Sequence, residues 1–142
     1  MNTKSSDDLK VFDIAGVITT NGKSTILYRL AGTSVTVPSL FKVGTGTTAP
    51  TVANTDLQTA VEITAGVYTK AFASGYPSVV PSASTITYRG VIASTEANGN
   101  TLTEFGIFNT DGTPLMYSRD THTGIVKNAY IQIVYESIDE II

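Results

Sequence analysis

Two turn signals divide the second half of the chain into short extended segments. Asn98-Gly99 and Asp111-Gly112 are typical of tight hairpin turns, because glycine accepts the positive φ of such turns and Asn or Asp tolerates it. The segments around them are rich in β-branched and aromatic residues and span residues 85–93, 102–108 and 125–135. This spacing predicts an antiparallel meander with short loops over residues 85–136.

The first half of the chain has a similar pattern with weaker boundaries. We expect strands at residues 11–18, 25–30, 35–37, 40–43, 61–63 and 67–72. Asn21-Gly22 is predicted to turn the chain between the first two of these strands. Residues 54–60 are expected to form one helical turn, with Asn54 or Thr55 as the N-cap. No longer stretch shows a sustained 3.6-residue apolar period, so helices should make up less than about 15% of the chain.

The last predicted strand alternates clearly. Ile131, Ile133 and Tyr135 face one way, whereas Tyr130, Gln132, Val134 and Glu136 face the other. Such alternation indicates one face in the core and one face partly in water. Short strands joined by polar turns therefore predict a mostly β fold, either an antiparallel β-sandwich or a small barrel of the jelly-roll type.

The two ends of the chain differ in apolar content. Residues 1–10 offer only Leu9 as apolar area, so we expect a flexible N-terminal arm there and a single β domain over residues 11–142. The arm is expected to order only on an adjacent protein. The isoleucines at the other end should pack on the domain or on a sister subunit, because they gain by leaving water. The candidate partner-binding residues are Leu9, Phe12, Ile138, Ile141 and Ile142.

The composition favours a surface that is buried in an assembly. Charged residues make up 15% of the chain, against about 25% in ordinary soluble domains, and 23 residues are threonine. A surface of Thr and Ser is less strongly hydrated than one of Lys and Glu. We therefore expect a homo-oligomer, with a trimer around one axis as the expected state.

Charge, hydropathy and cysteine count argue against several functional classes. The net charge is −3 and the nine Lys and Arg form no basic patch, so we expect no nucleic-acid partner. The apolar runs are far shorter than the roughly 20 residues of a membrane span, so no membrane partner is expected. The polar N-terminus does not resemble a signal peptide. The absence of cysteine excludes disulfides and thiolate metal sites.

Residues 16–24 look like a phosphate-binding loop, since they follow a predicted strand and end in Gly22-Lys23-Ser24. The nucleotide-binding loop needs four residues between its glycines, whereas five separate Gly16 from Gly22. The loop must also open a helix, and the residues that follow are predicted to form a strand. A hairpin turn therefore explains this segment better than a phosphate site.

The search for catalytic and metal-binding residues leads to rejections. His122 is the only histidine, and Ser118 and Asp120 lie near it in a predicted polar loop without a Gly-x-Ser-x-Gly motif. Residues 109–111 offer two oxygen ligands but lack the distal glutamate of a calcium loop. We therefore predict a protein that is not an enzyme and that has no catalytic residue, no cofactor and no metal site.

Glu104 and Gly106 lie at unusual places on a predicted strand. A buried Glu104 would need a partner, which Arg89 or Lys127 on neighbouring strands could supply, whereas simple alternation would point it to solvent. Both alternatives stay open. Gly106 inside a strand indicates a bulge or a close approach of backbone.

Several segments together resemble small β-structured virion proteins of tailed bacteriophages. They are residues 43–50 (VGTGTTAP) with Leu57, residues 104–108 (EFGIF), Asp111-Gly112, and Lys127 before the last strand. The resemblance covers most of the chain, over residues 40–136. It implies a non-enzymatic structural role in a virion that is assembled in the host cytoplasm. The implied partners are further copies of the chain and the major capsid protein or other virion proteins.

Three functional hypotheses follow. The first is a capsid decoration (cement) protein that binds the shell and its own neighbours, because the chain has no shaft repeat and no heptads. The alternative is a tail or tail-fibre component, as an adaptor or a receptor-binding module. A carbohydrate-binding β-sandwich outside any virion is disfavoured, because aromatic residues make up 8% of the chain and Trp is absent.

Overall fold

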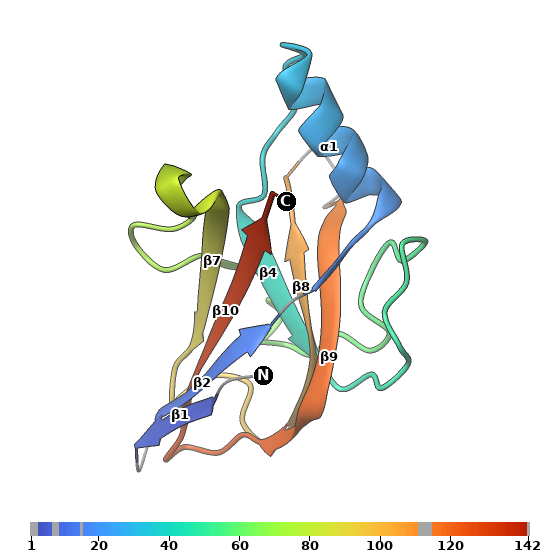
Figure 1. Cartoon of the computed structure of the whole chain (residues 1–142). Coiled ribbons are helices and arrows are strands. Elements are labelled where there is room, and N and C mark those ends of the chain that lie inside the picture. The colour runs from blue at the N-terminus through green and yellow to red at the C-terminus, as the bar shows by residue number, and fades with distance from the viewer. Residues whose placement is uncertain (1–2, 7–8, 15, 111–114, 142) are drawn as a thin grey trace.

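Two five-stranded β-sheets form a sandwich in the computed structural model of the chain, and one α-helix, α1 (Thr20–Leu30), stands at one end (Figure 1). The structure describes residues 3–6, 9–14, 16–110 and 115–141, the first two ranges by their backbone alone. The predicted mostly β fold is confirmed, as a sandwich of two separate sheets. α1 has 11 residues and the 3-10 helix at Pro81–Ala83 has three, in keeping with the low helix content expected.

The first sheet has the strand order β1-β2-β10-β7-β6. Its strands are β1 (Thr3–Ser6), β2 (Leu9–Ile14), β6 (Ser78–Val80), β7 (Thr85–Ile92) and β10 (Gln132–Glu140). Val134 of β10 lies opposite Val91 of β7 in an antiparallel pair and opposite Val11 of β2 in a parallel pair. The last strand of the chain is therefore the centre of this sheet.

The second sheet has the strand order β3-β9-β8-β4-β5 and is antiparallel throughout. Its strands are β3 (Val17–Ile18), β4 (Leu40–Gly44), β5 (Lys70–Ala71), β8 (Thr101–Phe108) and β9 (Met116–Val126). The predicted turn at Asp111-Gly112, between β8 and β9, lies outside the described residues.

The predicted meander is wrong in its connections. β7 and β8 follow each other in the chain but lie in different sheets, and so do β9 and β10. The Asn98-Gly99 turn exists, with Gly99 at φ +88°, but it carries the chain from one sheet to the other. The polar loop predicted around Ser118, Asp120 and His122 is wrong, because these residues lie on β9.

The core lies between the two sheets. Tyr135 of β10 stacks on Phe105 of β8 with ring centroids 4.6 Å apart, and Tyr88 of β7 meets Tyr117 of β9 at 5.7 Å. Ile133 and Tyr135 are fully buried, whereas the side chains that alternate with them, those of Gln132, Val134 and Glu136, are exposed or partly exposed. The predicted alternation of the last strand is confirmed.

Helix α1 replaces the strand predicted at residues 25–30 and the turn predicted at Asn21-Gly22. The Thr19 side chain caps its first turn by accepting the N–H of Gly22 at 3.0 Å. Gly32, at φ +79°, follows its C-terminal end, and its N–H bonds the carbonyl of Arg29. These two caps outweigh the turn signal and the β-branched residues inside the helix.

Other local predictions also fail. No strand forms at residues 35–37 or 61–63, no helical turn forms at residues 54–60, and β5 takes up only two residues of the strand predicted at 67–72. Residues 45–59 instead form an irregular loop. The division into an arm at residues 1–10 and a domain at residues 11–142 stays a prediction, and the backbone of β1 and β2 extends the first sheet.

Candidate functional site

A buried ion pair joins the two long strands of the second sheet. Glu104 of β8 is 0% exposed and Arg119 of β9 is 1% exposed. The guanidinium donates to Oε2 of the carboxylate from both Nε, at 3.0 Å, and Nη2, at 2.8 Å. The partners predicted for Glu104 are therefore wrong, and so is the solvent-facing alternative. Arg89 instead pairs with Glu136 of β10.

The Glu104 carboxylate also holds the loop at residues 45–59. Its Oε1 accepts the backbone N–H groups of Gly46 at 3.1 Å and Thr59 at 2.8 Å, and Oε2 accepts that of Gln58 at 3.0 Å. A carboxylate that is bonded in this way is satisfied in the interior without water. One side chain thus fixes both ends of the loop.

Arg119 reaches into the middle of the same loop. Its Nη1 donates to Oδ1 of Asn54 at 3.2 Å and its Nη2 to Oγ1 of Thr48 at 3.3 Å. Gln58 adds a contact within the loop, because its Oε1 accepts the N–H groups of Thr47 and Thr48. The ion pair therefore anchors the loop over the outer face of the second sheet.

Two glycines of the bacteriophage-like segments allow this close packing. A Cβ on Gly46 would lie 2.7 Å from Oε1 of Glu104. A Cβ on Gly106 would lie 2.9 Å from side-chain carbons of both Leu57 and Phe108, which form a small apolar cluster under the loop. The close approach predicted at Gly106 is confirmed.

Lys127 has a similar supporting role. It is 0% exposed, and its Nζ donates to Oδ1 of Asn98 at 2.7 Å and to the carbonyls of Ser94 and Asn128. Burial lowers the pKa of Lys127. Glu104, the two glycines and Lys127 therefore hold turns and loops from inside, and a binding surface has to use other side chains.

The N-terminal end of α1 is closed to phosphate. A helix does begin in this segment, so the strand predicted here is wrong as a reason against a phosphate-binding loop. The spacing between Gly16 and Gly22 still differs from that of a nucleotide-binding loop. The N–H of Gly22 is taken by Thr19, whose hydroxyl donates to the carbonyl of Met116 at 2.6 Å. A Cβ on Gly22 would also collide with the carbonyl of Tyr117. This helix end is sealed against β9.

His122 lies on β9 and not in the polar loop predicted for it. Its Nε2 is 2.9 Å from the hydroxyl of Tyr135, and its Nδ1 is 2.9 Å from the carbonyl of Thr123. Burial lowers the pKa of His122 and raises that of Asp120 to about 6. Both ring nitrogens are therefore engaged in hydrogen-bonding contacts within the chain. Within the described ranges, no three or more His, Asp or Glu side chains cluster as metal ligands would.

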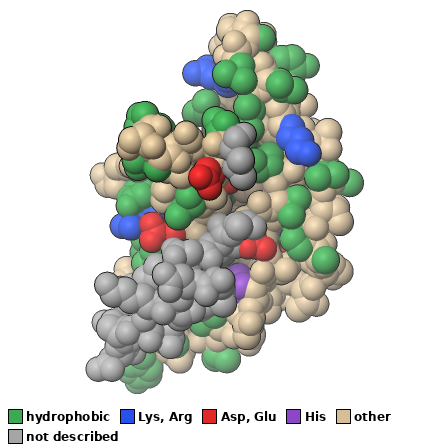
Figure 2. Space-filling model, in the orientation of Figure 1, with side chains coloured by type: hydrophobic (Ala, Val, Ile, Leu, Met, Phe, Trp, Pro, Cys, Tyr) green, Lys and Arg blue, Asp and Glu red, His purple; other side chains and the backbone are tan. Residues whose placement is uncertain are grey.

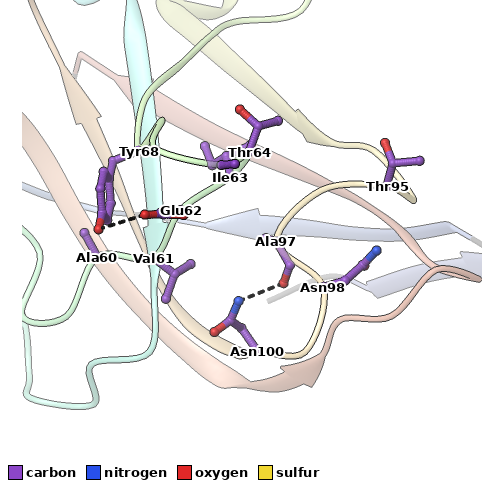
Figure 3. A pocket seen from close by; sticks show the side chains of 11 residues that line it. Ala60, Val61, Glu62, Ile63, Thr64, Tyr68, Thr95, Ala97, Asn98 and Asn100 are labelled. Atoms are coloured by element: carbon purple, nitrogen blue, oxygen red, sulfur yellow. Dashed lines mark hydrogen bonds between the residues drawn. The ribbon is translucent and has the colours of Figure 1, made fainter.

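A shallow polar pocket of about 550 Å³ lies beside the loop that carries Tyr68 (Figure 3). Tyr68 points its hydroxyl toward Glu62, 3.5 Å away. The amides on the far side serve the fold, because Asn98 and Asn100 donate to backbone carbonyls. The pocket therefore offers few free polar groups to a ligand.

An apolar groove runs between α1 and the end of the first sheet, and we call it the α1 groove. Its volume is about 660 Å³. Its walls include Ile26, Leu30, Val37, Val79, Asp139 and Ile141. Figure 2 shows hydrophobic side chains gathered over α1 at this end of the molecule. Most proteins cover such a surface, so the groove is the best candidate for a binding site.

An acidic side chain lies in this apolar groove. Asp139 accepts a hydrogen bond from the hydroxyl of Tyr117 at 2.9 Å, and Tyr88 packs against Tyr117. Burial raises the pKa of Asp139, and burial together with the nearby Asp139 charge raises the pKa of Tyr88 to about 12. Glu140 lies beside Asp139 on the rim. The groove thus combines apolar walls with negative charge.

The structure scatters the predicted partner-binding residues. Leu9 and Phe12 lie on β2, where the structure gives only their backbone, and Ile142 lies outside the described residues. Ile138 and Ile141 are 43% and 84% exposed, and Ile141 lines the α1 groove. Sequence reasoning missed the groove itself, because α1 was predicted as a strand.

No family model matches the chain, and neither a curated protein nor a solved structure shows significant similarity to it. None of the helices in the described residues is long and apolar enough to span a membrane.

Proposed function

We propose that this chain is a non-enzymatic structural protein of a tailed-bacteriophage particle, which assembles through the apolar surface around α1. The observation that carries the proposal is the exposure of Leu27, Tyr28 and Leu30, at 65%, 53% and 80%, beside the α1 groove. An isolated soluble domain gains nothing from such a surface, whereas an assembly protein buries it.

The distribution of apolar side chains favours a tail or tail-fibre component. The outer face of the first sheet carries polar groups such as the Arg89–Glu136 ion pair, and the loop at residues 45–59 covers the second sheet. Among the described side chains, the exposed apolar residues of α1 gather at one end, whereas the outer face of the first sheet combines this ion pair with the partly exposed Ile138. A protein that makes its contacts through one end of the domain fits a stacked assembly such as a tail.

A capsid decoration protein is the second candidate. Val126 and Tyr130, at the opposite end of β9 from α1, are 63% and 83% exposed. Two separated apolar contacts are what a clamp between a shell subunit and a neighbouring copy requires.

Quantitative mass spectrometry of purified particles tests the proposal. We expect the chain in the particle at a dozen or so copies for a tail component and at hundreds of copies for a decoration protein. Leu30→Asp should reduce incorporation at least tenfold, while Tyr130→Asp should do so only for the decoration role. Absence of the chain from purified particles would sink the proposal in both forms.

A further inference from the structure

The acidic side chains of the α1 groove lack basic partners. Asp139 and Glu140 make no ion pair with any Lys or Arg whose side chain the structure describes. Apolar walls beside carboxylates that form no ion pair favour a partner that is itself apolar and carries positive charge.

The outer side of α1 has the complementary character. Leu27 and Tyr28 are exposed and do not line the groove of their own chain. Lys23 also lies on α1, four residues before Leu27, and pairs with no carboxylate among the described side chains. Arg29 instead lines the groove of its own chain. The chain therefore carries an apolar groove with two carboxylates and one arginine, and an exposed apolar helix face with a lysine.

We propose that α1 of one copy docks in the α1 groove of a second copy. Leu27 and Tyr28 enter against Val37, Val79 and Ile141, and Lys23 of the docked helix faces Asp139 and Glu140. The inference rests on the proposed function, of which it specifies the partner. It also gives the exposed Ile141 a cover that its own chain does not provide.

The contact joins two different surfaces of the chain, so it is heterologous. Each copy offers its helix to one neighbour and its groove to another, and a series of such contacts closes into a ring or continues as a filament. The ring form agrees with the trimer expected from the composition.

Disulfide trapping tests the contact directly, because the chain contains no cysteine. Leu27→Cys and Val79→Cys each introduce one exposed thiol, so any disulfide must join two molecules. A mixture of the two variants should form the mixed Leu27→Cys/Val79→Cys dimer under mild oxidation in preference to either homodimer. Val126→Cys, exposed at the other end of β9, is the matched control and should not cross-link to Leu27→Cys. Homodimers alone, or equal cross-linking of the control, would overturn the proposal.

Sedimentation of the full chain tests the role of charge. Glu140→Lys should weaken self-association at least tenfold, whereas the same change at Glu62, in the polar pocket, should leave it unaltered. Equal effects of the two variants would contradict the docking geometry.

Two different outcomes separate the self-docking of the chain from its role in the virion. Suppose that the wild-type chain is monomeric and gives no cross-links, and that the Leu30→Asp variant still fails to enter particles. These results together would mean that the groove binds a different virion protein. Cross-linked chains that are absent from particles would instead keep the self-docking and remove the virion role.

Discussion

Glu104 and Arg119 face each other diagonally across β8 and β9. Glu104 lies opposite Thr121, and Arg119 lies opposite Gly106, two residues further along β8. The guanidinium therefore reaches the carboxylate along the diagonal between the two strands. The space above Gly106 is taken by Leu57, Phe108 and Met116, which pack beside this pair.

Neutralising either partner of this pair should destabilise the fold strongly. Glu104→Gln and Arg119→Met each leave an uncompensated polar group in the interior, and we expect each to lower the free energy of unfolding by about 3–5 kcal/mol. The double variant should lose less than the sum, since no lone charge remains. Urea unfolding measures these changes. Asp56→Asn is the control, because the Asp56 side chain in the pair with Lys42 is 56% exposed, and its neutralisation should cost at most about 1 kcal/mol. A loss at Glu104→Gln no larger than that of the control would contradict this account.

Gly106→Ala tests the close packing under the loop. The new methyl group would press on Leu57 and Phe108, so we expect a loss of about 1–3 kcal/mol in unfolding free energy. Gly16→Ala is the matched control, because its Cβ would approach its nearest neighbour only to 3.4 Å. Thermal unfolding of both variants compares them, and equal melting temperatures would refute the argument.

Asp120→Asn should stabilise the protein at neutral pH. Burial raises the pKa of Asp120 from 3.8 to about 6, so the folded chain holds this proton more tightly than the unfolded chain does. The wild-type charge therefore costs stability above pH 6, by about 1 kcal/mol after solvent screening, and this cost disappears as the pH falls to about 4. The variant should be more stable at neutral pH and equal to wild type near the lower pH. A variant that is less stable at neutral pH would show that the hydrogen bond from the Thr121 N–H and the nearby Arg119 charge outweigh the cost of burial.

His122→Gln should change the pH dependence in the opposite sense. Burial lowers the pKa of His122, so the unfolded chain binds a proton at a higher pH than the folded chain does. Wild-type stability should fall as the pH drops below about 6.5, and the variant should lack this part of the fall. The difference in unfolding free energy between the two proteins, measured across this range, isolates the histidine. A constant difference would exclude this role.

Local pattern predicted the strands that bury one face, and tertiary contacts decided the rest. The apolar alternation predicted β10 and the run of β-branched residues predicted β7, because both patterns depend only on residues within the strand itself. β9 could not be found in this way, because Arg119 is buried only by virtue of Glu104 and the loop over it. Helix α1 could have been found from its caps, since Thr19 and Gly32 stand at the spacing of an 11-residue helix.

The candidate site was less accessible to sequence reasoning than the fold. Ile141 was identified as a residue that needs a cover, from its apolar character alone. The groove around it is built from α1, Val37, Val79 and β10, which are far apart in the sequence. Only their assembly brings the carboxylate of Asp139 among apolar walls.

The central place of β10 has a consequence for how the chain reaches its native state. β2 (Leu9–Ile14) pairs with β10 (Gln132–Glu140), which follows it by more than a hundred residues and is therefore made later in synthesis. Until then β7 and β2 each present an open edge, and neither can reach the other. Contacts over such sequence separation form slowly, and unpaired edges invite pairing between molecules. Production at low temperature, or with chaperones that shield strand edges, should therefore raise the soluble yield more than changes to the surface would.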